Sequence, residues 1–310
     1  MKNPLTFART ALASLRASID AQTESVRAME RSVAIAAEDI AAISARQDAL
    51  LAELRRQGAA AFGAALDLRG TDAARYRDPL SLTHAPGQVY SQVNEDGILA
   101  EIFRRIGETN RQFVEIAAGD GIENTTRLLL DLGWSGLWVE AGDKEAASIR
   151  AVAGSFIDSG ALTFIDSRID RENVRSLVAP NVDPEPDLLS LDIDYNTSHI
   201  WRAMDFLRPR VVCIEYNGHY PPSVAYEVPY QADGAWQGTT RFGASLKALE
   251  LIGRDKGYSL VACDGHGVNA FFVRDDLCNA QRFQAPFTAE HHYEPPRYAS
   301  VHMRGHDRHG

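Results

Sequence analysis

The sequence predicts an α/β protein in which a mostly parallel β-sheet is covered by helices and preceded by one long N-terminal helix. Three observations lead to this prediction. Short apolar runs alternate with segments of helical periodicity, which is typical of strands joined by crossover helices. Several of these runs end in an acidic residue, at the edge of the sheet where ligands bind in such folds. Residues 12–54 carry an uninterrupted heptad pattern.

Composition and charge exclude several classes of protein. The 310 residues are 45% hydrophobic and 24% charged, as in ordinary globular proteins, and the net charge of −10 argues against a nucleic-acid binder. The sequence has no apolar run long enough for a transmembrane helix, and its N-terminus has no continuous apolar core of a secretory signal. Three scattered cysteines, Cys213, Cys263 and Cys278, indicate thiols in a reducing compartment. We therefore expect a cytoplasmic location, with contact to a membrane only through partners.

The N-terminal segment, residues 1–57, is predicted to be a coiled-coil helix that forms a homo-oligomer through residues 12–54. Ten of its thirteen a and d positions are large and apolar, and neither Pro nor Gly interrupts them. A parallel dimer is the simplest expectation, with a trimer left open; the alternative is one amphipathic helix packed on its own domain. The heptad positions are Leu12, Leu15, Ile19, Gln22, Val26, Met29, Val33, Ala36, Ile40, Ile43, Gln47, Leu50 and Leu54.

Three further segments follow. Residues 58–87 lose the heptad period and contain six Gly and Pro residues, which predicts a linker with at most a short helix. The folded domain is predicted over residues 88–283. Residues 284–310 contain three prolines and are predicted to be an irregular C-terminal tail.

Within the domain, residues 91–107 are predicted to form a helix with Glu95 and Asp96 in its first turn. Strands are expected in 113–116, 134–142, 162–166, 187–194 and 210–217, and a helix capped by Asn124 or Thr125 that extends to Leu132 should follow the first strand. Residues 243–258 read as a helix that ends at Gly257, and 258–265 and 269–276 as two closely spaced strands. Seven strands with the last two adjacent are typical of the class I methyltransferase sheet, a Rossmann-like fold.

The first strand runs into a glycine turn, Ala117 to Gly121, that points to a nucleotide-like ligand. Gly119 and Gly121 let the backbone approach a ligand closely. Glu140 ends the second strand about 20 residues later, where an acid accepts hydrogen bonds from ribose hydroxyls.

Asp166 and Ser167 end the third strand, where an adenine amine could be read. The third glycine of a dinucleotide-binding turn is replaced by Asn124, so the cofactor S-adenosylmethionine fits better than a nicotinamide dinucleotide. For each acid taken singly, the alternative is a helix cap or a solvent-facing strand end.

A second group of polar side chains ends the fourth and fifth strands. Asp192 and Asp194 are two residues apart, as are Glu215 and Asn217, so each pair is expected on one face of its strand. Oxygen ligands of this kind suit Mg²⁺, Mn²⁺ or Ca²⁺, which would lower the pKa of an acceptor hydroxyl. The alternative is one buried acid that contacts the cofactor and one that caps a helix.

Residues 218–243 form a long insert, rich in aromatic residues, Pro and Gly, that is predicted to cover an acceptor site. His219 is a candidate general base, although a surface histidine packed against the aromatic residues would look the same. Flat aromatic faces with polar tips suit sugar rings, and the insert offers Tyr220, Tyr226, Tyr230 and Trp236.

The segments SQVNEDGI, FVEIAAGDGIENT, GWSGLWVE, LLSLDID, RPRVVCIEYN, FGASLKAL and GVNAFFVRDDL, in this order, resemble FkbM-type S-adenosylmethionine-dependent methyltransferases. The resemblance runs from about Gln88 to Leu277. It implies that Glu115, Gly119 and Gly121 line the cofactor pocket, with Glu140 at the ribose, Asp166 at the adenine and Asp192 facing the methyl donor. The family mostly O-methylates sugars or other hydroxyl groups in polysaccharide and natural-product pathways.

The chain departs from the family pattern at two places. Ala117 stands where a glycine is expected, at a close approach to the cofactor, and Tyr195-Asn196-Thr197 replaces an expected Gly-Asn-Asp run. The second departure weakens any metal site.

The leading hypothesis is an O-methyltransferase acting on a sugar hydroxyl of a surface polysaccharide or glycolipid. Asp192, Asp194, Glu215 and His219 would be its catalytic residues, and Asp192, Asp194 and Glu215 would hold any metal. A glycan-synthesis complex is a further partner that the coiled coil could dock. The alternative is a non-catalytic methyltransferase-like scaffold recruited through the coiled coil. A nicotinamide-dependent oxidoreductase is disfavoured by the incomplete phosphate-binding turn.

Overall fold

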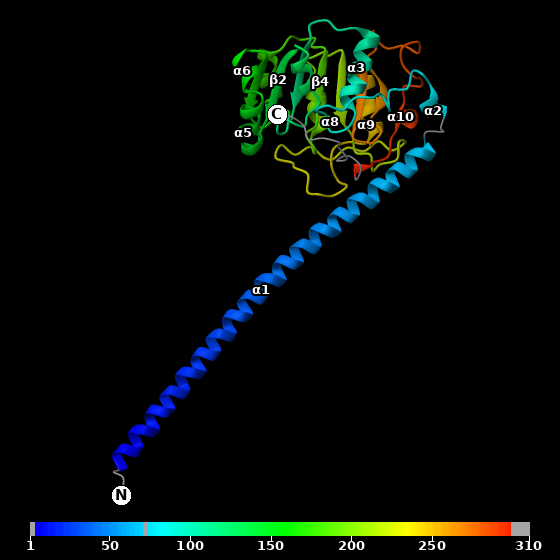
Figure 1. The fold of residues 1–310 in the computed structure, drawn as a ribbon. Coiled ribbons are helices and arrows are strands. Elements are labelled where there is room, and N and C mark those ends of the chain that lie inside the picture. The colour runs from blue at the N-terminus through cyan, green and yellow to red at the C-terminus, as the bar shows by residue number, and fades with distance from the viewer. Residues whose placement is uncertain (1–3, 71–73, 299–310) are drawn as a thin grey trace. The chain divides into compact units, whose positions relative to one another are not determined.

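The computed structural model describes residues 4–70 and 74–298, in two units that comprise residues 1–59 and 60–310. The first unit is part of one continuous helix, α1 (Pro4–Gly70), drawn in blue in Figure 1. This helix continues past Gly58 and Gly63 into the segment predicted as a linker, whereas the division between the two units lies close to the predicted boundary at residue 57. Gly lowers helix stability by only about 1 kcal/mol, and its neighbours here are mainly alanines, which favour helix.

A seven-stranded sheet forms the centre of the second unit, as the sequence predicts. The strand order is β3-β2-β1-β4-β5-β7-β6, with β7 antiparallel to both of its neighbours and all other pairs parallel. This is the arrangement of a class I methyltransferase sheet. The strands are β1 (Gln112–Ile116), β2 (Ser135–Glu140), β3 (Leu162–Asp166), β4 (Leu188–Leu191), β5 (Val211–Glu215), β6 (Tyr258–Cys263) and β7 (Asn269–Arg274).

Helices cover both faces of the sheet (Figure 1). One apolar layer packs the sheet against α7, α8 and α9, and the other packs it against α3, α4 and α5. The helices are α2 (Ala74–Arg77), α3 (Glu95–Ile106), α4 (Arg127–Asp131), α5 (Asp143–Val152), α6 (Gly154–Asp158), α7 (Val174–Val178), η1 (Ala179–Asn181), α8 (Thr197–Ala203), α9 (Leu246–Lys256) and α10 (Ala289–His292).

Local sequence explains several helix ends. Ser245 caps α9 by accepting a hydrogen bond from the Ala248 amide, and Gly257 ends it in the left-handed conformation (φ 80°), as predicted. The helix after β1 differs from the prediction: it is only five residues long and begins after Thr126, without a side-chain cap. Asn124 and Thr126 are engaged by Glu115 instead.

The domain extends beyond both predicted limits of 88 and 283. At the N-terminal side, Leu82 is buried, and the Arg75 guanidinium donates to the backbone carbonyls of His291 and Tyr293. At the C-terminal side, residues 284–298 form α10 and adjoining segments that pack on the domain, with Ala289 buried. The predicted linker and tail are therefore partly folded structure; the tail's last twelve residues lie outside the described residues.

Candidate active site

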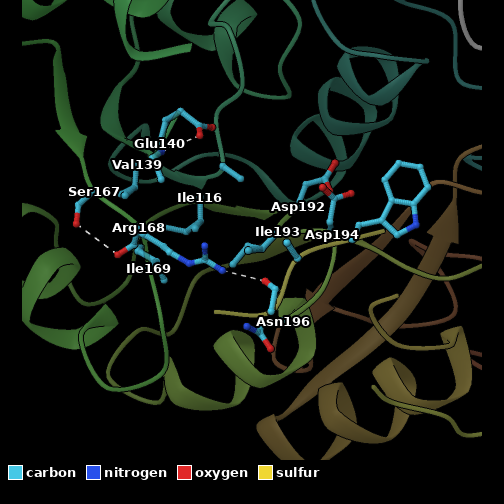
Figure 2. A pocket seen from close by; sticks show the side chains of 15 residues that line it. Ile116, Val139, Glu140, Ser167, Arg168, Ile169, Asp192, Ile193, Asp194 and Asn196 are labelled. Atoms are coloured by element: carbon cyan, nitrogen blue, oxygen red, sulfur yellow. Dashed lines mark hydrogen bonds between the residues drawn. The ribbon is translucent and has the colours of Figure 1, made fainter. Parts of the chain in front are cut away.

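A cavity of about 210 Å³ lies at the carboxyl ends of β1, β2 and β4. We call it the donor cavity, after the methyl donor that the sequence predicts at these strand ends. Figure 2 shows Glu140 and Ser167 at one end of this cavity and Asp192 and Asp194 at the other. The carboxyl edge of a parallel sheet is the usual ligand site in this class of fold. The lining residues are Ile116, Ala117, Val139, Glu140, Ala141, Ser167, Arg168, Ile169, Asp192, Ile193, Asp194, Asn196, Gly234, Ala235 and Trp236.

The turn after β1 borders this cavity through Ala117, which has a left-handed backbone (φ 62°). Gly119 is also left-handed, and its amide donates to Glu140 Oε2 at 2.9 Å. Gly121 plays a packing role, because a Cβ there would lie 3.1 Å from a side-chain carbon of Ile149. Ala117 therefore lies at the cavity as predicted, whereas Gly119 and Gly121 are not among the lining residues.

Glu140 and Ser167 both line the donor cavity, as the sequence predicts. Glu140 Oε1 accepts from the amides of Ala141 and Gly142, so both carboxylate oxygens are held by backbone donors. The Ser167 amide donates to the backbone carbonyl of Glu140, which joins the ends of the two strands. Oε2, which accepts only from the Gly119 amide, has a further lone pair that a ribose hydroxyl could occupy, whereas Oε1 already accepts two hydrogen bonds.

Glu115 and Asp166 do not line the cavity, contrary to the prediction. Glu115 is buried and accepts hydrogen bonds from Asn124, Thr125 and Thr126, so it braces the start of α4. Burial raises the pKa of this carboxyl to about 7, although the hydrogen bonds oppose the shift. Asp166 instead forms an exposed ion pair with Arg150 at 2.6 Å.

Three carboxylates meet where β4 and β5 end. One oxygen from each of Asp192, Asp194 and Glu215 lies within 4.8 Å of the others. Strand β4 stops at Leu191, so the two aspartates lie in the loop beyond it, with Asp194 in a left-handed conformation (φ 57°). Asn217 does not join this carboxylate cluster; its amide group donates to the carbonyls of Thr240 and Phe242 and holds the insert.

The carboxylate cluster is electrostatically strained. The side chains of Asp192 and Asp194 are exposed to solvent at the cavity wall. The protein around the cavity nevertheless removes much of the water that would solvate their charges. Burial, followed by the charge of Asp194, raises the pKa of Asp192 to about 6. Burial and the charges of both aspartates raise the pKa of Glu215 well above its ordinary range.

A second cavity, of about 360 Å³, meets the first at Asp192, Asp194 and Trp236. His219 also lines this acceptor cavity, with its ring edge-on to those of Phe242 and Tyr298 at centroid distances of 6.4 and 5.7 Å. The structure thus brings together all four predicted catalytic residues. The lining is Gln92, Asp192, Asp194, Glu215, His219, Trp236, Gly238, Thr239, Thr240, Phe242, Val268 and Tyr298.

Only one of the four predicted aromatic residues of the insert, Trp236, lines the acceptor cavity. Tyr220 and Tyr226 stack on each other at 4.3 Å, and Tyr230 donates to Glu172. Phe242, Tyr298 and Gln92 also line this cavity, and the sequence pattern does not predict them as site residues. Tyr298 lies beyond the predicted domain, and nothing in the local sequence marks it.

Side chains from the donor side hold the insert in place. The Arg168 guanidinium donates to the Gly234 carbonyl at 2.9 Å, a contact drawn in Figure 2. Asn196 donates to the Gln231 carbonyl at 2.6 Å. Thr197 stands where the family pattern has an acid, and its side chain is buried. Its hydroxyl oxygen accepts a hydrogen bond from the Ile193 amide, so Thr197 supports the loop that carries Asp192 and Asp194.

The carboxylate cluster also fits a divalent cation. Its oxygen donors are the type that Mg²⁺ or Ca²⁺ prefers. In the part of the chain that the structure describes, Glu215 Oε2 is buried without a hydrogen-bond partner, which leaves it available as a ligand.

Comparisons with known proteins give fold neighbours only. No protein-family model and no curated protein matches the chain. Among solved structures, the chain is similar to the METTL16 methyltransferase domain (12% identity, TM-score 0.37), covering 59% of this chain and 66% of that one. It is also similar to the glycopeptide N-methyltransferase MtfA (15%, TM-score 0.36; 59% and 91%) and to an O-methyltransferase family protein from Burkholderia thailandensis (10%, TM-score 0.36; 58% and 57%). We therefore base the function on the geometry of the site.

Within residues 4–70 and 74–298, no helix is both long and apolar enough to cross a bilayer.

Proposed function

We propose that this protein is an S-adenosylmethionine-dependent O-methyltransferase of the FkbM type that methylates a sugar hydroxyl of a surface polysaccharide or glycolipid. One observation carries the proposal: the donor cavity and the acceptor cavity meet at Asp192, Asp194 and Trp236. Methyl transfer requires a donor and an acceptor held in line, with little water between them. Two cavities that join at ionisable groups support this proposal, because a donor in one and an acceptor in the other would meet there.

The donor cavity favours a cofactor without phosphates. The Gly119 amide, which would bind a pyrophosphate in a dinucleotide site, already donates to the Glu140 carboxylate. The Asp120 carboxylate accepts from the amides of Ile122 and Glu123 in the same turn. Two acids at this turn would repel a phosphate, whereas Glu140 suits ribose hydroxyls and the apolar Ile116, Val139 and Ile169 suit an adenosine ring system.

S-adenosylmethionine would supply a methyl group activated by its sulfonium charge. The carboxylates of Asp192 and Asp194 would stabilise that positive charge and orient the acceptor hydroxyl. Because its pKa is about 6, Asp192 is a stronger base than an ordinary aspartate and would take the hydroxyl proton as the oxygen attacks. His219, on the acceptor side, would carry the proton onward or serve as the base itself.

The acceptor cavity has the composition of a sugar site. Trp236, Phe242 and Tyr298 offer flat apolar faces, and Thr239 and Thr240 contribute polar groups. Asp192, Asp194 and Glu215 would hold Mg²⁺ if a metal takes part, and the ion would lower the pKa of the acceptor hydroxyl. Such an enzyme would work in the cytoplasm, where a glycan-synthesis complex would present its substrate.

Two measurements test the proposal. Calorimetry should show binding of S-adenosylmethionine and none of NADH; the reverse result would contradict the donor assignment. Purified protein with labelled donor should then transfer label to surface glycans extracted from the source organism, and mass analysis should find an O-methyl sugar. Donor binding without transfer to any glycan would instead favour the non-catalytic scaffold, and transfer that persists after chelation would exclude the metal.

A further inference from the structure

We propose that residues 12–54 of α1 pair with the same segment of a second copy of this chain in a parallel, in-register, two-stranded coiled coil. The ten large apolar side chains at the heptad positions are 51–69% exposed on α1. An exposed stripe of this length marks an interaction surface. Its strict spacing of three and four residues matches a partner helix with the same repeat, and this chain carries that repeat itself.

The surface of α1 already has the shape that such a partner needs. Knobs-into-holes packing inserts one side chain into a hollow made by four residues of the facing helix. One hollow on α1 is lined by Val26, Met29, Glu30 and Val33, which form such a set of four, together with Ala34 and Ala37. One heptad earlier, a second hollow is lined by the equivalent set Ile19, Gln22, Thr23 and Val26, together with Arg27 and Glu30. In-register pairing would place Met29 of the second copy in the first hollow and Gln22 in the second.

The two glutamines in the stripe select the register. Gln22 occupies a d position and Gln47 an a position, and an amide buried against apolar side chains is costly. Among parallel pairings, only the unshifted one places each glutamine opposite its own copy, because a slip of one heptad sets Gln22 against Met29. One antiparallel pairing also brings the amides together, with Gln22 opposite Gln47.

The a positions bear on the number of strands. Four of them hold β-branched residues, Ile19, Val26, Val33 and Ile40, which favour two strands over three in a parallel coil. The second test below separates the parallel from the antiparallel pairing. In a parallel pair, both chains leave the coil at the same end, so two catalytic units would meet the same stretch of substrate. For a repetitive polymer, this raises the effective concentration of the second site.

The first test measures the mass of the full-length protein by light scattering at micromolar concentration. We expect twice the chain mass of 34.1 kDa. Ile40→Glu, which places a charge in the stripe, should give the monomer mass. Ala45→Glu adds the same charge on the opposite side of the helix and should remain a dimer. A monomeric or trimeric wild type, or two variants with equal masses, would overturn the pairing.

The second test fixes direction. Under mild oxidation, full-length Leu15→Cys should cross-link to itself, because in-register pairing places the two copies of this residue in one layer. The unsubstituted chain controls for its own cysteines. Cross-links that form only when Leu15→Cys is mixed with Leu54→Cys would show the antiparallel pairing and overturn the proposal, as would the absence of any cross-link.

Discussion

At the scale of single residues, Ala117 has a backbone conformation that glycine adopts more easily. Its φ of 62° lies in the left-handed region, where a Cβ crowds the following carbonyl. The residue also borders the donor cavity. Strain at a ligand-binding turn persists only when the surrounding structure holds it in place, here through the amide of Ala117 donating to the Val139 carbonyl.

Ala117→Gly should therefore stabilise the protein. Relief of the backbone strain is offset in part by the greater flexibility of glycine in the unfolded chain, which leaves a net gain of about 0.5–1 kcal/mol in the free energy of unfolding. Urea unfolding followed by circular dichroism measures this change. Ala118→Gly is the matched control: Ala118 is buried and not left-handed, so losing its methyl group should destabilise. Equal effects of the two substitutions would show that backbone strain at residue 117 is unimportant.

Asp192 links activity to stability. If it accepts the proton, Asp192→Asn should lower turnover by about 10²–10⁴-fold, whereas Asp158→Asn, at an exposed site on α6, should leave it unchanged. Wild-type turnover should rise with pH through about 6, as Asp192 ionises. Turnover in Asp192→Asn close to that of the wild type would remove Asp192 from the mechanism.

The same substitution should alter the pH dependence of stability. The folded-state pKa of Asp192 is raised, so its protonated form stabilises the fold at low pH and this contribution is lost as pH rises through about 6. In the presence of a chelator, the midpoint temperature of unfolding of Asp192→Asn should therefore rise relative to that of the wild type as the pH increases from 5 to 8. A constant difference across this range would contradict the raised pKa of Asp192.

At the scale of elements, two acids that look equivalent in the sequence, at the ends of β2 and β3, have different surroundings in the structure. Glu140 lies at the cavity and organises the turn after β1, while Asp166 pairs with Arg150 at the surface. The two residues are register partners in adjacent parallel strands. Their different roles therefore come from what each side chain meets beyond the strand.

Glu140→Gln should weaken binding of S-adenosylhomocysteine, the demethylated product of the donor, by roughly 2–3 kcal/mol, because charge-assisted bonds to the ribose are lost. Asp166→Asn should leave the affinity unchanged, since Asp166 is not at the cavity. Calorimetry gives both values. Equal losses would restore Asp166 to the cofactor site, and no loss for Glu140→Gln would remove the proposed ribose contact.

At the scale of the whole molecule, the second unit, residues 60–310, depends on chain segments on both sides of the predicted domain. Arg75, just after α1, forms an ion pair with the Glu294 carboxylate at 2.5 Å, and the Glu294 side chain is almost fully buried. Tyr76 also donates to this carboxylate. Arg297 pairs with the other oxygen of Glu294 at 2.9 Å, so the segment before residue 88 supplies one of two arginines that neutralise this buried charge.

A chain that begins at Gln88 should be less stable than one that begins at Ala74, by about 2–5 kcal/mol, because it removes the buried Leu82 and leaves Glu294 with Arg297 but without Arg75. Urea unfolding of the two shortened chains measures the difference. Equal stabilities would mean that residues 74–87 add nothing to the fold.

The sequence by itself determined the sheet. The apolar runs at 113–116, 134–142 and 210–217 are long enough only for strands, and burying them on both faces requires covering helices, so the seven strands follow from local pattern. The convergence of Asp192, Asp194 and Glu215 was also predictable, because parallel strands deliver their carboxyl ends to one edge of the sheet.

Only the tertiary structure decided which strand-end residues line the donor cavity. Ile116 and Ala117 line the donor cavity, while Glu115, its side chain directed away from it, braces α4. Side chains alternate between the two faces of a strand, and a slip of one residue exchanges their roles, which sequence spacing alone does not resolve. Tyr298 and Arg75 lie in segments without periodicity, and contacts between residues more than 200 positions apart leave no local pattern to read.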